Sequence, residues 1–277
     1  MTVEHVDGRF AGAAGGQIYW QGWVPAEVTG VVVVCHGLAE HGGRYAHVGK
    51  RFAAEGYATY VNDHRGHGRS DGVRANIDRM STVVTDLETM IRSAAQRHPG
   101  VPLFLFGHSM GGLVALVYAT GRPAALDGLV LSGVALDIAR GGRVERVGAR
   151  LMSAVAPNLG VLRLDATAVS RVPEVVRDYE TDPLNYRGKI RSRTGAEMLA
   201  AADAVTAKLP TLRLPLLVLH GTADRLTRPA GSRLVADRAA GADVTLKLYD
   251  GWYHELHNEP DSETVFADVV RWLKEHG

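Results

Sequence analysis

The hexapeptide Gly107-His108-Ser109-Met110-Gly111-Gly112 joins an apolar run, Leu103–Phe106, to a helical pattern, Leu113–Tyr118. A serine flanked in this way fits the G-x-S-x-G pattern, in which a sharp turn between strand and helix exposes the serine hydroxyl. The flanking glycines have no Cβ, so the strand and the helix can approach each other closely. The pattern predicts that Ser109 is a nucleophile, with the Met110 N–H at the helix N-terminus aimed at a developing oxyanion.

Strand and helix patterns alternate along most of the chain. The runs Val31–Cys35 and Pro215–Leu219 are apolar on both faces, as is typical of parallel strands covered by helices. Weaker patterns predict strands at Ala58–Val61, Gly128–Ser132 and Val244–Tyr249, and helices at Tyr45–Glu55, Met80–His98, Gly111–Thr120, Arg228–Ala239 and Ser262–His276. This alternation predicts an α/β fold with a mostly parallel central sheet flanked by helices. The opening segment, Arg9–Trp23, is expected to form an antiparallel edge.

The alternation stops between about Leu136 and Leu209, where strand-like runs are absent and Arg-rich helical stretches take their place. We interpret residues 136–209 as a helical cap inserted between two strands of the sheet. Residues 1–135 and 210–277 are then the two parts of the core. No linker or charge block marks a separate domain.

Composition restricts the classes of partner. The 277 residues are 46% hydrophobic, and 31 Lys and Arg against 30 Asp and Glu give a net charge of +1, which argues against nucleic acid. The first residues lack the basic and apolar regions of a standard signal peptide, and the apolar runs are far shorter than a membrane span. We therefore expect a cytoplasmic protein. The one cysteine, Cys35, lies inside an apolar strand and is interpreted as a buried thiol, although its place beside a loop of the site leaves open that it modulates activity.

A serine nucleophile needs a base and a carboxylate that orients the base. Asp224 follows the strand at Pro215–Leu219, and His254 lies in the loop after the strand at Val244–Tyr249. The chain order Ser, Asp, His and the positions at strand ends favour these two residues over Asp250 and His257. His254 would take the proton of Ser109, and Asp224 would hold the imidazole.

A tetrahedral intermediate needs a second N–H donor from the loop after an early strand. The run His36-Gly37-Leu38-Ala39-Glu40-His41 follows the strand Val31–Cys35, so the Leu38 N–H is the candidate, with the Met110 N–H as its partner. His36 itself is interpreted as shaping the loop. No H-E-x-x-H motif occurs, and we expect neither a metal nor a cofactor.

These motifs resemble those of the monoacylglycerol lipase family, a serine aminopeptidase (S33)-like group within the α/β-hydrolase superfamily. The resemblance covers almost the whole chain and depends on five segments: His36–Tyr45, Asp63–Asp71, Gly107–Gly112, Gly221–Arg225 and Tyr253–Glu259. It implies an α/β-hydrolase fold with a cap over a Ser-His-Asp site, an acyl tunnel, and hydrolysis of monoacylglycerol to fatty acid and glycerol.

Carried over by position, the resemblance implies a triad of Ser109, Asp224 and His254 and an oxyanion hole of Leu38 and Met110. It also places four residues near the glycerol end of the substrate: Glu40, Arg44, Tyr179 and His257. In the cap, only the segment Tyr179–Leu184 and fragments around it match the family.

The cap also carries a pattern of its own. Arginines recur at helical spacing, with apolar residues between them, and an apolar loop follows at Val155–Leu164; the set is Arg140, Arg143, Arg146, Arg150, Val144, Val147 and Leu151. One interpretation is a solvated helix face over a packed one. The other is an amphipathic lid that lies on a membrane or lipid droplet surface and takes up monoacylglycerol from it. The sequence is compatible with both interpretations of the cap. It is also compatible with a homodimer.

Other activities are compatible with the same residues. A lysophospholipase, a general carboxylesterase or a cofactor-free haloperoxidase would use the same triad. A dehalogenase or epoxide hydrolase is disfavoured, because its nucleophile would be an Asp where this chain has Ser109. From a different class, a non-catalytic lipid-binding protein on the same fold stays open, since fold does not determine function.

Overall fold

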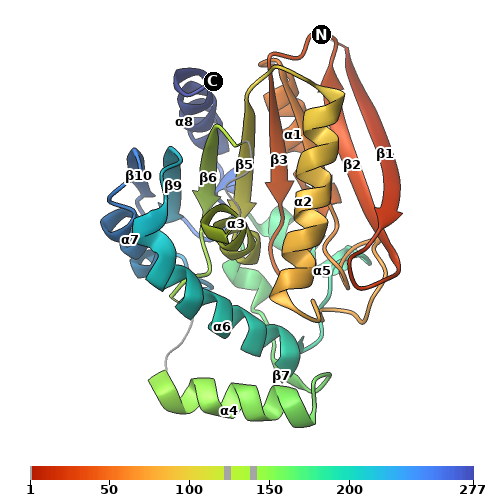
Figure 1. Cartoon of the computed structure of the whole chain (residues 1–277), viewed down its shortest axis with the longest axis vertical. Helices are drawn as coiled ribbons and strands as arrows, with labels where there is room; N and C mark the ends of the chain where they lie inside the picture. The colour runs from red at the N-terminus through yellow and green to blue at the C-terminus, as the bar shows by residue number, and fades with distance from the viewer. Residues whose placement is uncertain (1, 122–125, 138–141) are drawn as a thin grey trace.

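An eight-stranded sheet runs through the middle of the molecule, with strand order β1-β2-β4-β3-β5-β6-β9-β10 (Figure 1). The computed structural model describes residues 2–121, 126–137 and 142–277, without the side chains of residues 143–145. The strands of the sheet are β1 (Val3–Ala11), β2 (Gln17–Pro25), β3 (Gly30–Cys35), β4 (Tyr57–Asn62), β5 (Leu103–His108), β6 (Gly128–Ser132), β9 (Leu216–Gly221) and β10 (Val244–Tyr249). In this order, every pair of neighbouring strands from β4 to β10 is parallel. Strands β1 and β2 pair antiparallel with each other, and β2 pairs antiparallel with β4, so they form an antiparallel edge.

Helices cover both faces of the sheet, which confirms the predicted α/β architecture. In Figure 1, α2, α3, α6 and α7 lie in front of the sheet, and α1 and α8 lie behind it. The helices are α1 (Ala46–Ala53), α2 (Met80–Arg97), α3 (Met110–Gly121), α4 (Gly142–Val155), α5 (Pro173–Thr181), α6 (Ser192–Lys208), α7 (Pro229–Arg238) and α8 (Ser262–Glu275). Among the described residues, none of these helices has the length and apolarity required to cross a bilayer.

Strand β3 shows why the predicted strands are apolar on both faces. Its side chains alternate between two buried layers: Val31, Val33 and Cys35 pack into the layer under α2 and α3, whereas Val32 and Val34 pack into the layer under α1 and α8. Because both layers exclude water, neither face of the strand tolerates a polar residue. The result is the uninterrupted apolar run in the sequence.

The chain between β6 and β9 leaves the sheet and returns beside its point of departure, since these two strands are adjacent and parallel. It contains α4, α5 and α6. It also contains two short antiparallel strands, β7 (Gly160–Leu162) and β8 (Ile190–Arg191), so the expectation that this segment lacks strands was wrong. Each strand has only two or three residues, too few to form a periodic pattern.

Helix α6 belongs both to this segment and to the core. Met198, Ala201 and Val205 on its buried face join the apolar layer under α3. Its exposed face is tied to α4 by Arg146, whose guanidinium bonds both oxygens of Asp203 at 2.6 and 2.8 Å. The division of the chain at residues 136 and 209 stays a prediction.

The turn between β5 and α3 brings the start of α3 against the end of β3. A Cβ built on Gly111 would lie 1.9 Å from the carbonyl oxygen of Cys35 and 2.5 Å from that of His36. Both obstacles are backbone atoms of a buried strand end, so neither can move aside. Only glycine fits at this position.

We predict that Gly111→Ala lowers the free energy of unfolding by roughly 3 kcal/mol, because the new methyl group must push α3 away from β3. Gly195→Ala in α6 is the matched control, since a Cβ there meets nothing within 4 Å. Alanine has the higher helix propensity, so this control is expected to stabilise the protein by about 0.5–1 kcal/mol. Denaturant titration measures both. Equal stability of the two variants would contradict the contact at Gly111.

Candidate active site

The backbone at Ser109 has φ +55°, a left-handed conformation that non-glycine residues rarely adopt. Hydrogen bonds on both sides hold it there: Ser109 N–H donates to Ser132 O at 2.9 Å, and Ser109 O accepts from Ala135 N–H at 3.1 Å. Strain of this kind persists only where the surrounding structure imposes it, and it concentrates at functional sites. The sharp turn between β5 and α3 agrees with the sequence pattern, the Ser109 residue is partly exposed, and its role as nucleophile stays a prediction.

Asp224 and His254 meet at the carboxyl ends of β9 and β10. These strands are parallel neighbours, so their following loops leave the same edge of the sheet. His254 Nδ1 donates to Asp224 Oδ2 at 2.6 Å, and both side chains are buried. Thr227 N–H and Thr227 Oγ1 donate to the same carboxylate at 2.9 and 2.8 Å, which fixes its orientation. His254 Nε2 has no hydrogen-bond partner among the described residues and is free to act as a base.

The charges of this pair depend on each other. Burial raises the pKa of Asp224, but the charge of His254 and the surrounding hydrogen bonds outweigh burial and hold that pKa below its usual value. Burial alone would lower the pKa of His254. The Asp224 carboxylate outweighs this effect of burial, so the His254 pKa lies above 6.5. A carboxylate that stays ionised and an imidazole of raised basicity are what proton abstraction from a serine needs.

The rival acid, Asp250, is an exposed turn residue. Its Oδ1 accepts from Thr222 Oγ1 at 2.9 Å, and no hydrogen bond among the described residues joins Asp250 to His254.

Ser109 lies at the same edge of the sheet as the Asp224–His254 pair. The ring of His108, the preceding residue, lies 4.6 Å from the ring of His254 between centroids. Gly133, which follows the acceptor of the Ser109 N–H, approaches His254 so closely that a Cβ there would lie 3.1 Å from Nδ1. Among the described residues, Ser109 and His254 share no hydrogen bond of 3.5 Å or less. The structure therefore joins Asp224 to His254 directly and places Ser109 beside the pair.

The two predicted oxyanion donors, Leu38 and Met110, lie next to Ser109. Gly37 lies against it, since a Cβ on Gly37 would be 3.3 Å from Ser109 Cβ. Leu38, the next residue, and Met110, which follows Ser109, donate their N–H groups to no other described residue. Two free N–H groups beside a nucleophile are suited to bind an oxyanion.

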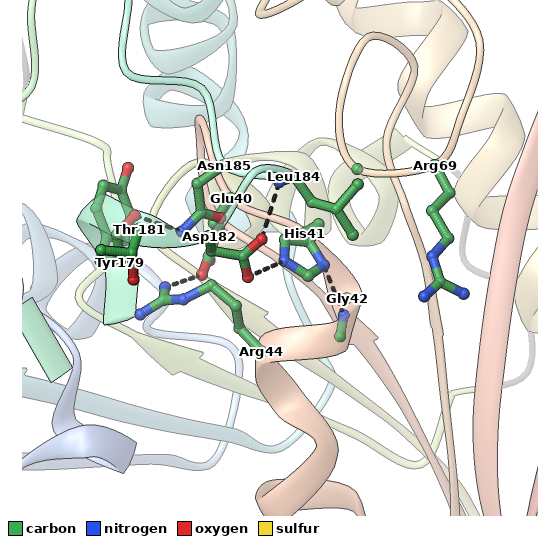
Figure 2. Close-up of polar contacts among 12 residues, drawn as sticks. Glu40, His41, Gly42, Arg44, Arg69, Tyr179, Thr181, Asp182, Leu184 and Asn185 are labelled. Atoms are coloured by element: carbon green, nitrogen blue, oxygen red, sulfur yellow. Dashed lines mark hydrogen bonds and ion pairs between the residues drawn. The ribbon is translucent and has the colours of Figure 1, made fainter. Parts of the chain in front are cut away.

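Three of the four residues predicted near glycerol belong to one buried charge network (Figure 2). Arg44 Nη1 bonds Glu40 Oε2 at 2.5 Å, and the Arg44 guanidinium lies 4.9 Å from the centre of the Tyr179 ring. Arg44 also forms a two-pronged pair with Glu255, at 2.6 and 2.7 Å. Sequence reasoning missed Glu255, although it stands next to His254 in the segment Tyr253–Glu259.

The network has two carboxylates around one guanidinium. Burial raises the pKa of Glu255, but Arg44 outweighs burial and holds it below the usual range. For Glu40, burial and the charge of the neighbouring Glu255 outweigh the effect of Arg44, so the pKa of Glu40 is raised. Glu40 Oε1 still accepts from Gly37 N–H at 2.5 Å and from Tyr45 OH at 2.8 Å, so it ties the network to the oxyanion loop, residues 36–41.

The fourth residue, His257, lies deeper. Its ring stacks on Tyr45 at 4.9 Å and meets the His108 ring edge-on at 5.1 Å. Both ring nitrogens are buried, and neither has a hydrogen-bond partner among the described residues. Burial lowers the pKa of His257 to about 3, so the ring is neutral.

The oxyanion loop also contacts the chain between β6 and β9, and sequence reasoning missed both contacts. His41 Nε2 donates to Asp182 Oδ2 at 2.9 Å (Figure 2). Tyr186 N–H donates to Ala39 O at 2.9 Å, and Ala39 has φ +68°. Residues 182–186 therefore hold the loop at two points, Ala39 and His41.

No three His, Cys, Asp or Glu side chains of the described residues are grouped as a metal ion would require. A hollow of about 430 Å³ lies between α5 and Tyr253, and one of about 130 Å³ lies between Ala39 and the segment 183–186. Ser109 lines neither, and the acyl tunnel stays a prediction.

Comparison with known proteins agrees with this geometry. The chain is 43% identical to a monoacylglycerol lipase of Mycolicibacterium smegmatis over 269 residues, 96% of each chain. It is 34% identical to the monoglyceride lipase of Homo sapiens over 268 residues, 95% of this chain and 88% of the human one. The fold matches the crystal structure of the Paleococcus ferrophilus monoacylglycerol lipase with a TM-score of 0.83, at 28% identity and with 100% of both chains covered.

The α/β-hydrolase fold predicted from the sequence is thereby confirmed. A family model described as serine aminopeptidase, S33, matches residues 26–261. With the relatives above, this match shows that the chain belongs to the serine aminopeptidase S33 family of α/β hydrolases.

Proposed function

We propose that this protein is a serine ester hydrolase that cleaves monoacylglycerols to a fatty acid and glycerol, with Ser109, Asp224 and His254 as its triad. The observation that carries the proposal is the buried Asp224–His254 hydrogen bond of 2.6 Å at the sheet edge where Ser109 occupies its strained turn. The relatives named monoacylglycerol lipase and monoglyceride lipase supply the substrate class.

The reaction follows from this arrangement. His254 Nε2 takes the hydroxyl proton of Ser109 while Oγ attacks the ester carbonyl. The carbonyl oxygen becomes an oxyanion, which accepts hydrogen bonds from the N–H groups of Leu38 and Met110. The bond to the glycerol oxygen breaks as His254 returns the proton to that oxygen. Water then attacks the acyl-enzyme with His254 again as base, releasing the fatty acid and regenerating Ser109.

Glu40, Arg44, Tyr179 and His257 are proposed to surround the glycerol end of the substrate. Arg44 and Tyr179 stack on each other beside the oxyanion loop, and the Arg44 side chain is only 10% exposed. A guanidinium and carboxylates whose positions are fixed by mutual pairing lose little entropy when they bind a polyol. The neutral His257 ring would act through packing.

The second interpretation of the cap, contact with a lipid surface, is favoured by its exposed apolar side chains. Val155, at the end of α4, is 85% exposed, and large apolar residues are exposed around it: Val147, Leu151, Met152, Leu159, Val161 and Leu162. Figure 1 places α4 at one end of the molecule, beyond α6. An exposed apolar cluster of this kind is typical of an interaction surface.

Of the four cap arginines, Arg140 and the side chain of Arg143 lie outside the described residues. Arg146 is paired with Asp203, so it also stabilises the contact between α4 and α6. A test of membrane contact is therefore better made on the apolar side chains.

We predict that, in a panel of monoacyl, diacyl, triacyl and lysophospholipid substrates, kcat/KM is highest for a monoacylglycerol. We also predict that Ser109→Ala lowers turnover of every substrate roughly 10⁴-fold or more. The variant should keep its melting temperature, because only the hydroxyl is removed. A higher kcat/KM for lysophospholipid would favour the lysophospholipase alternative. Failure of the wild-type protein to react with a fluorophosphonate would favour the non-catalytic lipid-binding protein.

We predict that kcat/KM rises with pH as His254 loses its proton, with an inflection above 6.5, because the carboxylate of Asp224 raises the His254 pKa. Asp224→Asn removes the charge but keeps the shape. It should move the inflection to lower pH, since burial then dominates, and lower kcat about 10⁴-fold. Steady-state kinetics between pH 5 and 9 measure both. An inflection that stays in place in Asp224→Asn would mean that another group titrates.

We predict that the double variant Leu151→Ser, Val155→Ser binds anionic liposomes more weakly than the wild type, because it removes apolar area exposed on α4. Hydrolysis of a short, soluble ester should be unchanged, because both side chains are exposed on α4 and neither belongs to the proposed triad. Liposome co-sedimentation and a soluble-ester assay on the same preparations separate the two effects. Unchanged liposome binding would rule out the membrane-facing interpretation of the cap.

A further inference from the structure

The peptide unit between Gly37 and Leu38 supplies one of the two oxyanion donors, and its opposite end is held by a side chain. His36 Nδ1 lies 2.7 Å from Gly37 O, within hydrogen-bond distance. A trans peptide is planar, with its C=O and N–H groups pointing in opposite directions. A bond that fixes the direction of Gly37 O therefore also fixes the direction of the Leu38 N–H.

The second nitrogen of the ring shows which atom carries the proton. His36 Nε2 lies 2.9 Å from the backbone N of His64, which can only donate. Nε2 must therefore accept, and in a neutral ring the proton is on Nδ1. Nδ1 can then donate to Gly37 O, which can only accept. Both bonds are satisfied by one tautomer.

The ring is held from the far side by the loop after β4. His64 Nε2 donates back to His36 O at 3.1 Å, and the two rings lie 4.1 Å apart between centroids. His36, His64 and Cys35 are completely buried, and the pKa of His36 lies well below 6.5 because of burial and the neighbouring His64 and His67. The ring therefore stays neutral, so it keeps one donor and one acceptor across the working pH range.

We propose that His36 is a positioning residue for the oxyanion hole: it orients the Gly37–Leu38 peptide so that the Leu38 N–H faces the reacting carbonyl. The proposal rests on the proposed function, because it assigns the Leu38 N–H to the oxyanion. It also gives the Asp63–Asp71 segment a role, since His64 holds the ring in place. The simpler alternative is that His36 only fills space at the end of β3.

Two substitutions separate these roles. In His36→Asn the amide nitrogen takes the place of Nδ1 and can still donate to Gly37 O. In His36→Gln the polar group moves to the place of Nε2, so the bond to His64 N–H survives and the bond to Gly37 O is lost. His67→Gln is the matched control, because His67 lies in the same cluster but bonds Arg65 O.

The readout is the ratio of kcat/KM for an ester to that for the corresponding thionoester, in which sulfur replaces the carbonyl oxygen. Sulfur accepts weaker hydrogen bonds, so the thionoester depends less on the oxyanion hole. A ratio of two rates on one sample does not depend on how much of the protein is folded. It therefore separates a misplaced donor from a loss of stability.

We expect His36→Gln to lower kcat for the ester about 10²-fold with KM nearly unchanged, and to lower the ester-to-thionoester ratio about tenfold. His36→Asn should recover most of both, and His67→Gln should leave the ratio at its wild-type value. If His36→Gln and His67→Gln lose activity alike, with the ratio unchanged in both, His36 only packs. Absence of ester hydrolysis by the wild-type protein would instead contradict the proposed function.

A measurement on the wild-type protein covers the case in which the His36 variants do not fold. Nitrogen-15 NMR of the histidine rings, assigned by comparison with single His variants elsewhere and by through-space contacts to Cys35 and His64, reports which nitrogen is protonated. The proposal requires a neutral His36 ring with its proton on Nδ1 between pH 6 and 8. A ring with the proton on Nε2 could not donate to Gly37 O and would overturn the proposal.

Discussion

The close approach of helix α3 to the carboxyl end of β3 is the contact on which the site depends. At Gly111 the helix lies against the carbonyl oxygens of Cys35 and His36, nearer than any side chain would allow. This contact sets the turn of Ser109 beside the loop that carries Leu38. The two proposed oxyanion donors, Leu38 N–H and Met110 N–H, come from these two segments. A bulkier residue at position 111 would separate them.

Next to this contact, a group of charged side chains is buried at the edge of the sheet. Glu40, Arg44 and Glu255 are buried together, and burying charges costs free energy that their mutual attraction does not always recover. Their contacts indicate what this arrangement provides. Glu40 accepts from Gly37 N–H inside the oxyanion loop, and Arg44 links Glu40 to Glu255, the residue after His254. The network therefore joins the segments that carry Leu38 and His254, the proposed oxyanion donor and general base. Rigid, preorganised polar groups are what electrostatic catalysis requires.

Sequence reasoning predicted the parts whose pattern is local. The six parallel strands, the antiparallel edge, and the Asp224–His254 pair were found because buried strands are continuous apolar runs and strand ends meet at one edge. It did not find Glu255, or the bonds from Asp182 and Tyr186 to the oxyanion loop, because each joins residues more than 140 positions apart. No local period marks such pairs. It also assigned His36 to loop shape without seeing that the shape includes the direction of one N–H group.

The acyl-enzyme is the species that only this mechanism requires, and detecting it is the most direct test of the account. A monoacylglycerol mixed with the protein and quenched in acid within milliseconds, followed by mass spectrometry of its peptides, should show the fatty acyl group esterified to Ser109. The adduct should be absent from Ser109→Ala and should disappear as substrate is exhausted. An acyl group on another residue, or rapid hydrolysis with no adduct at any quench time and no burst of glycerol release, would contradict the mechanism.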